Sequence, residues 1–171
     1  YTSSDGDIVM PLSSIEWGGA KITTNAYNSD KNIGVITFDI PIQTIGKEAF
    51  MSCNSLKEIF IPSQVTTISA SAFKNCLLLE KVICNTKLET INSSAFYGCK
   101  QLKEISLPNS VTTIGSSCFY NCTSLNNIIL PEELSTIGAN VFQNCTNLKS
   151  ISIPTNITEI PKYAFDGCSA L

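Results

Sequence analysis

Two cysteines, Cys118 and Cys122, lie four residues apart in the stretch GSSCFYNCTS, with hydroxyl side chains on both sides. Four residues make about one helical turn, so the two thiols can point toward the same place. Thiols in this arrangement can form a redox pair or supply half of the ligands of a zinc site. Both cysteines can also be buried packing residues without chemistry.

Other kinds of chemistry are limited by two missing residue types. The 171 residues include no histidine, and all eleven basic residues are lysines. Without histidine the chain has no imidazole base and no histidine metal ligand, and without arginine it has no bidentate donor for phosphate or guanine. We therefore predict no enzyme activity, no catalytic residues, no cofactor and no nucleic-acid partner. No apolar run is long enough for a transmembrane segment.

The cysteines follow an internal repeat that places one cysteine at the same point of each copy. The repeat is 23 residues long. A phenylalanine stands three residues before each of these cysteines and a leucine three residues after it. The structural cysteine column consists of Cys53, Cys76, Cys99, Cys122, Cys145 and Cys168. Cys118 replaces the alanine found at this repeat position in four other copies, and Cys84 occupies a position that is otherwise isoleucine or leucine. A buried structural role is therefore favoured for all eight cysteines.

Disulfides between neighbouring copies remain an alternative, because stacked strands lie about 4.8 Å apart, within the range that a disulfide spans. A zinc site is disfavoured, since no close C-x-x-C pairs or histidines complete a tetrahedron. Asp5, Asp7 and Asp30 lack the spacing of a calcium loop, so no metal site is predicted.

Each copy predicts one coil of a solenoid. An alternating β-branched segment such as KEIFIP (57–62) predicts a short strand that ends at proline, and the next such strand comes one full copy later, which is too far for a hairpin and favours parallel stacking. Six strands are expected around residues 36–38, 59–61, 82–84, 105–107, 128–130 and 151–153. A second extended segment follows, as in SVTTIG (110–115), and then a short helical turn. A left-handed residue is expected before the cysteine, at Asn75, Gly98, Asn121, Asn144 and Gly167.

The two ends of the array differ. Residues 1–32 do not repeat and contain the only tryptophan, Trp17, so we expect an N-terminal capping segment there. The solenoid is expected over residues 33–171, as a degenerate first half-repeat followed by about five and a half repeats of 23 residues. The last copy has no polar cover in the sequence, so the expectation is either that the natural chain continues beyond Leu171 or that another copy covers this end by self-association.

The repeat SLKEIFIPSQVTTISASAFKNC and its relatives resemble the treponemal-type leucine-rich repeat of the BspA-like surface proteins. This resemblance implies a right-handed leucine-rich repeat solenoid in a bacterial protein that is secreted or held on the cell surface. It also implies adhesion to host extracellular-matrix or cell-surface proteins, with fibronectin and fibrinogen as ligands of the family. The first residue, Tyr1, is consistent with an exported mature form or with a shortened chain.

The outward positions of the strands form the candidate binding site on the concave strand face. This column is expected to be polar, yet it contains Phe60, Ile83 and Ile129, which favour an interaction patch. Glu58, Lys81 and Glu104 stand beside them with alternating charge, which also predicts ion pairs within the sheet. Two alternatives stay open: a structural spacer, or the non-catalytic portion of a larger surface protein or enzyme whose chemistry lies elsewhere. A deep pocket with paired carboxylates would favour the enzyme, and a shallow open sheet would favour the binding module.

Overall fold

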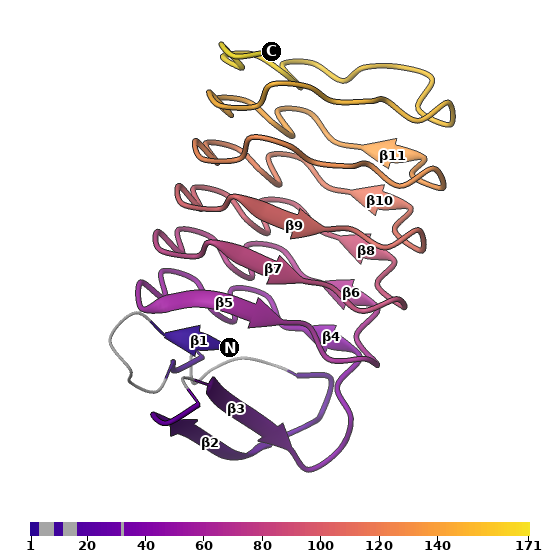
Figure 1. The fold of residues 1–171 in the computed structure, drawn as a ribbon. Helices are drawn as coiled ribbons and strands as arrows, with labels where there is room; N and C mark the ends of the chain where they lie inside the picture. The colour runs from indigo at the N-terminus through magenta and orange to yellow at the C-terminus, as the bar shows by residue number, and fades with distance from the viewer. Residues whose placement is uncertain (4–8, 12–16, 32) are drawn as a thin grey trace.

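The backbone winds into a stack of coils (Figure 1) in the computed structural model of the chain, which describes residues 1–3, 9–11, 17–31 and 33–171. Equivalent residues of neighbouring coils are paired in parallel with an offset of one repeat, as in Thr67 opposite Thr90. A parallel solenoid with this period was expected from the sequence, and the structure confirms it.

The first ladder of the solenoid is formed by the KEIFIP-type segments. Their alternating apolar side chains point into the coil. Pro62 and Pro108, which have no N–H to donate, follow the first and third of the parallel strands, whereas Asn85 stands at this position after the second. The parallel strands are β5 (Leu56–Phe60), β7 (Lys81–Ile83) and β9 (Glu104–Ser106), and β1 (Thr2–Ser3) adds to β5 in the antiparallel sense.

The second ladder runs along another side of the stack and is built from the repeated Thr-Ile pairs. In each pair the isoleucine is buried and the threonine lies at the surface, as expected for a strand with one buried face. The strands are β4 (Thr44–Ile45), β6 (Thr67–Ile68), β8 (Thr90–Ile91), β10 (Thr113–Ile114) and β11 (Thr136–Ile137), all parallel.

Two of the predicted strands, at residues 128–130 and 151–153, are wrong. The backbone passes through both segments without forming ladder pairs, and the first ladder ends at β9. For the first segment the sequence supplies a physical reason, because Asn126 and Asn127 replace the lysine and glutamate of earlier copies and asparagine is depleted in strands. The segment 151–153 then has no strand at 128–130 to pair with.

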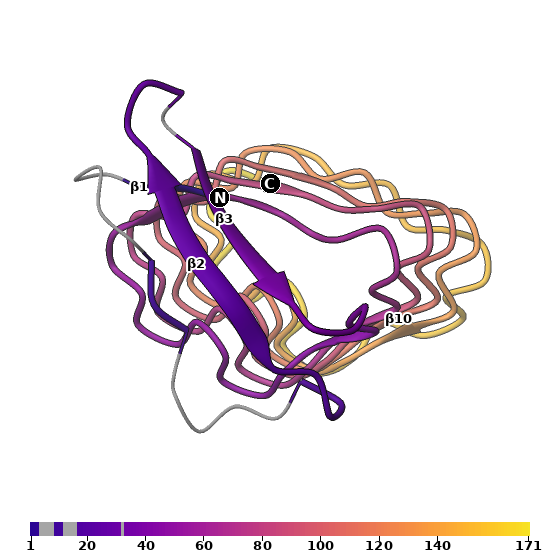
Figure 2. The ribbon, with the colours of Figure 1, turned by 90° about the horizontal axis from the view of Figure 1, so that it is seen from below.

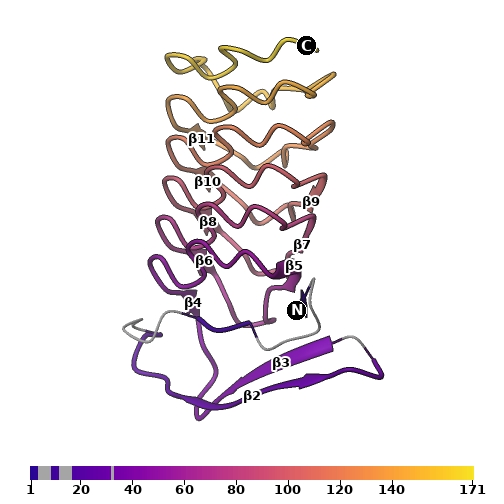
Figure 3. The ribbon, with the colours of Figure 1, turned by 90° about the vertical axis from the view of Figure 1, so that its left-hand side faces the viewer.

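The predicted strand at 36–38 exists but belongs to a different sheet. It is part of β3 (Ile33–Phe38), which pairs in the antiparallel sense with β2 (Ile22–Asn28) and not with β5. The resulting hairpin lies across the N-terminal end of the stack (Figures 2 and 3). Trp17 connects it to the first coil, since its ring centroid lies 5.0 Å from that of Phe38 and 6.1 Å from that of Phe50.

The predicted helical turns are also wrong, because no helix is present in the part of the chain that the structure describes. Alternate backbone N–H groups point in different directions here. Phe73 donates to Ala95 of the next coil, whereas Lys74 donates to Ser71 of its own coil. A helix would keep every N–H within its own coil, so these tight turns contribute to stacking in a way that a helix cannot.

The turns require two left-handed residues in each coil. The position before each column cysteine from Cys76 onward has a φ between +59° and +72°, which confirms the prediction for Asn75, Gly98, Asn121, Asn144 and Gly167. The second position, four residues earlier, was not predicted. It has a φ between +55° and +59° at Glu48, Ser71, Ser94, Ser117, Asn140 and Tyr163.

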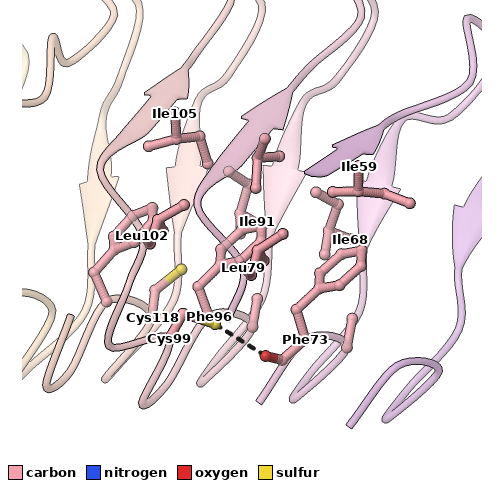
Figure 4. Packing of buried hydrophobic residues seen from close by; sticks show 14 of the residues in the cluster. Ile59, Ile68, Phe73, Leu79, Ile91, Phe96, Cys99, Leu102, Ile105 and Cys118 are labelled. Atoms are coloured by element: carbon pink, nitrogen blue, oxygen red, sulfur yellow. Dashed lines mark hydrogen bonds between the residues drawn. The ribbon is translucent and has the colours of Figure 1, made fainter. Parts of the chain in front are cut away.

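The core is a set of columns that run along the solenoid. Phenylalanine rings stack face to face from Phe50 to Phe165, with centroids 5.2–5.7 Å apart. Figure 4 shows the adjacent leucine, isoleucine and cysteine columns between the two ladders. One coil cannot bury these side chains alone, so each coil is stabilised chiefly by its neighbours.

Candidate functional site

The cysteines, which motivated the first chemical hypotheses, are all free thiols. Each column cysteine from Cys76 to Cys168 donates its S–H to the main-chain oxygen of the phenylalanine in the preceding coil, over 2.9–3.2 Å. Figure 4 shows this bond between Cys99 and Phe73. The thiols therefore point at carbonyl groups, an arrangement in which neighbouring sulfurs are not bonded to one another.

Cys118 and Cys122 are both fully buried in the core. Burial raises the pKa of the thiols because the interior disfavours the thiolate: the pKa of Cys145 rises to about 12, and that of Cys122 lies well above the usual value. A redox pair or a zinc site needs accessible, ionised thiolates, and these two residues do not provide them.

Metal-ligating residues do not gather elsewhere in the described ranges, which contain no group of three or more histidine, cysteine, aspartate or glutamate side chains close enough to hold an ion. Asp5 and Asp7 lie outside the described residues, so the structure does not place them.

The burial of the thiols leads to a prediction about their reactivity. We expect maleimide at pH 8 to leave Cys76, Cys99, Cys118, Cys122 and Cys145 unmodified in the native chain and to modify them in denaturant. The partly buried Cys53, Cys84 and Cys168 should react first. Peptide mapping by mass spectrometry measures each site. Native labelling of the five buried thiols as fast as in denaturant would contradict the packing described here.

The predicted site residues occupy one exposed sheet face. Phe60 is in register with Ile83 and Ser106, and Glu58 is in register with Lys81 and Glu104, across β5, β7 and β9. The structure therefore brings five of the six predicted site residues onto one ladder. We call this surface the strand face.

Ile129, the sixth predicted residue, follows Ser106 in the same column but lies outside the ladder, on the next coil. Its side chain is 76% exposed, compared with 46% for Phe60. Ile129 still belongs to the strand face, because it lines the same shallow depression as Ile83.

This depression has a volume of about 520 Å³ and is open to solvent. Ser106 lies between the larger Ile83 and Ile129 in the outward column, so its short side chain leaves a notch between them. The polar residues around it are Lys81, Lys103, Glu104, Asn126 and Asn127. We call this feature the Ser106 notch.

The charges of the strand face neutralise one another, as the alternating signs predicted. Lys81 lies 2.9 Å from Glu104, and Lys103 lies 2.8 Å from Glu80. The hydrogen bond from Lys103 lowers the pKa of the Glu80 carboxyl, and the hydrogen bond to Glu104 raises the pKa of the Lys81 ammonium. Each shift favours the charged form of the group, that is, the Glu80 carboxylate and the Lys81 ammonium. Because both ion pairs are exposed to solvent, each contributes little to stability.

The site residues predicted from the sequence do not include Ser106, Asn126 or Asn127. The signal is present, because the Lys-Glu alternation of earlier copies changes to Asn-Asn in the copy that begins at Leu125. Neither asparagine side chain makes a hydrogen bond in the described structure, and both are exposed. Their amide groups are thus available to a partner.

A second, more apolar depression of about 260 Å³ lies where the hairpin meets the first coil. Its lining includes Trp17, Phe38 and Phe50, with Phe60 from the strand face at its edge. Phe60 therefore lies between this hollow and the rest of the strand face. Neither depression contains a pair of carboxylates free of lysine partners, which is the feature that would have favoured an enzyme.

The repeats match a known sequence family. The model of the BspA type leucine-rich repeat region matches this chain in six copies, over residues 20–119 and 66–171. No curated protein matches the sequence. Within the described residues, no helix is long and apolar enough to cross a membrane.

Several solved structures share the fold. A leucine-rich repeat protein from T. pallidum is 27% identical with a TM-score of 0.76, and the match covers 86% of this chain and 76% of that one. For a leucine-rich repeat protein from Bacteroides ovatus the identity is 27%, the TM-score 0.71 and the coverage 88% and 45%. For one from Eubacterium ventriosum the values are 28%, 0.65, 75% and 41%. The match therefore covers less than half of each of the last two structures, and this chain spans about half of their length.

Proposed function

The chain belongs to the family of BspA-type leucine-rich repeat proteins, and from this premise we propose that it is a non-catalytic module that binds a protein partner through its strand face. Solenoids of this kind present extended, repetitive surfaces suited to protein binding. The observation that carries the proposal is the apolar outward column of Phe60, Ile83 and Ile129, which a purely structural surface would not need.

The place of action that we propose is the cell surface or the extracellular space of a bacterium. The solved structures that share the fold come from bacteria, and one of the similar proteins is named a pneumococcal vaccine antigen. A host matrix or cell-surface protein is accordingly the proposed partner.

A second role, as a scaffold within a larger surface protein, is favoured by one observation. The matches cover 45% and 41% of two similar structures, so comparable repeats occur within longer proteins. In this role the ion pairs of the strand face, whose charges neutralise one another, would serve solubility only.

Self-association through the C-terminal coil stays a prediction, which sedimentation velocity tests directly.

The proposal predicts that the variant Phe60→Ser/Ile83→Ser/Ile129→Ser loses partner capture without losing the fold. Fibronectin, fibrinogen and a solubilised matrix extract are the baits, and retained chain is quantified. We expect at least a tenfold loss of retention, because exposed apolar side chains at an interface core contribute most of its affinity. Thermal unfolding should change little, because Phe60 and Ile129 are exposed and Ile83 is only partly buried, so none of the three lies in the core.

The matched control is Leu77→Ser/Leu78→Ser, which removes two exposed leucines that lie outside the strand face, in the turn after Cys76. Retention of this control should equal that of the wild type. If both variants lose retention equally, the apolar column has no specific role; if the wild type is not retained by any bait, the scaffold role is favoured instead.

A further inference from the structure

The Ser106 notch has the dimensions of a socket for one side chain. Ile83 and Ile129 are two coils apart, and over the same two steps the rings of the phenylalanine column are spaced 5.6 and 5.4 Å from coil to coil. Ser106 lies between them and is exposed. One large apolar side chain fits between the two isoleucines, with contact on both sides and the serine at the base.

The border of the notch changes character at β9. Among the described residues, no backbone hydrogen bond joins Glu104–Ser106 to the segment 126–130, although β7 and β9 are fully paired. The notch thus has a strand along one side and an irregular segment along the other. The irregular segment carries Asn126 and Asn127, whose amides have no partner within the described structure.

The electrostatics of the notch indicate what it accepts. Its lysines and its glutamate are already paired, Lys81 with Glu104 and Lys103 with Glu80, so an added charge would have to break an existing pair. An uncharged ligand avoids that cost. The side-chain polar groups left over are the Ser106 hydroxyl and the two asparagine amides. Each amide can donate to a carbonyl and accept from an N–H, as a peptide main chain requires.

From this geometry we infer that the notch binds an extended, uncharged peptide segment of the partner, with one large apolar side chain between Ile83 and Ile129. The Asn127 amide, with Asn126 beside it, hydrogen-bonds to the main chain of that segment. The inference rests on the proposed function and names the chemistry of the partner: a neutral, extended stretch such as Ser/Thr/Gly around a single leucine or phenylalanine.

The test is a selection of displayed random dodecapeptides that bind the immobilised wild-type chain. The Ser106→Leu variant is present in solution as a competitor, so that it removes peptides that bind outside the notch. Ser106→Leu fills the notch and is expected to lower peptide affinity at least tenfold. Asn127→Ala should lower it several-fold. Ser152→Leu is the matched control, because it makes the same change in the same column at an exposed position that does not line the notch. Its affinity should be unchanged.

The enriched peptides should share one large apolar residue in a neutral polar context. Equal binding to wild type and Ser106→Leu, enrichment of charged peptides, or no enrichment would overturn the inference. A second copy of the chain as occupant would also overturn it, and would appear as a dimer in sedimentation velocity that Ser106→Leu dissociates.

The two proposals fail separately in these experiments. If matrix proteins are retained and lost with the triple variant but not with Ser106→Leu, the protein-binding function stands and the peptide inference fails. If the selected peptides bind at the notch while no matrix protein is retained, the peptide inference stands and the choice of a matrix partner is wrong.

Discussion

Replacing Phe119 by alanine is expected to lower the free energy of unfolding by about 3–5 kcal/mol. The side chain is fully buried, and its ring lies between those of Phe96 and Phe142 at centroid distances of 5.6 and 5.4 Å. The backbone of each coil is hydrogen-bonded to the coils before and after it. The coils therefore cannot collapse into the space that the ring leaves. The lost contacts are therefore not recovered elsewhere.

Phe119→Ala should also make the unfolding transition less cooperative. A solenoid is coupled only through contacts between neighbours, so a cavity at one coil weakens the connection between the two halves of the array. We expect urea unfolding, followed by circular dichroism, to shift to lower urea and to broaden. Phe60→Ala is the control with the same chemistry, since Phe60 is 46% exposed and should cost much less. Equal losses for both variants would contradict a stability based on the phenylalanine stack.

The sequence was sufficient to predict the features that recur in every copy. The coil, the columns and the parallel register all follow from the repeat period, because a side chain that must fill the same space in each coil leaves the same residue type at that position. The left-handed position before each cysteine was also predictable, since asparagine and glycine are the residues that adopt it most readily.

Features that depend on contacts between coils were not predictable in this way. Ser94 and Tyr163 adopt positive φ although serine and tyrosine rarely do, because the turns must send alternate N–H groups to the next coil. The local sequence of a single copy is therefore typical of a helical turn, although contacts with the next coil produce a different turn. Likewise, the loss of first-ladder strands after β9 depends on neighbours: Asn126 and Asn127 disfavour a strand in one copy, and the segment 151–153 of the next copy then has no adjacent strand to pair with.

The candidate site was predicted in part, for a related reason. An outward column is visible in the repeat, so Phe60, Ile83 and Ile129 stand out as unexpected apolar residues. A notch forms where a small side chain lies between large ones on different coils. Ser106 is part of the site only because Ile83 and Ile129 lie on either side of it. Sequence patterns mark unusual residues more readily than ordinary residues in unusual surroundings.

The free thiols are compatible with the extracellular location that we propose. Oxidising compartments favour disulfides, but disulfide formation needs a thiolate that can reach a second sulfur. The buried column thiols are held protonated by burial and are oriented toward carbonyl oxygens of the preceding coil, as for Cys122 and Phe96. Their protection comes from the fold, so it should last as long as the coils stay stacked.

The stacking of the coils depends on close approach of their backbones, and a substitution at Gly138 tests this dependence. Gly138 lies so near the preceding coil that a Cβ atom there would overlap the backbone nitrogen and Cα of Ser116. Its N–H donates to the Ile114 oxygen over 2.9 Å, so the two coils are held together at this point. A side chain at position 138 therefore forces two backbones apart.

We expect Gly138→Ala to lower the free energy of unfolding by about 2 kcal/mol. Overpacking that shifts a backbone costs about 3 kcal/mol, and the reduced freedom of the unfolded chain returns about 0.4–1 kcal/mol. The control is Asn92→Ala, which changes the equivalent position two coils earlier, where the fold already accommodates a side chain. Urea unfolding of the two variants gives the comparison. Equal stabilities would mean that the coils separate freely at this corner, and then the phenylalanine stack alone, rather than backbone approach, would hold the array together.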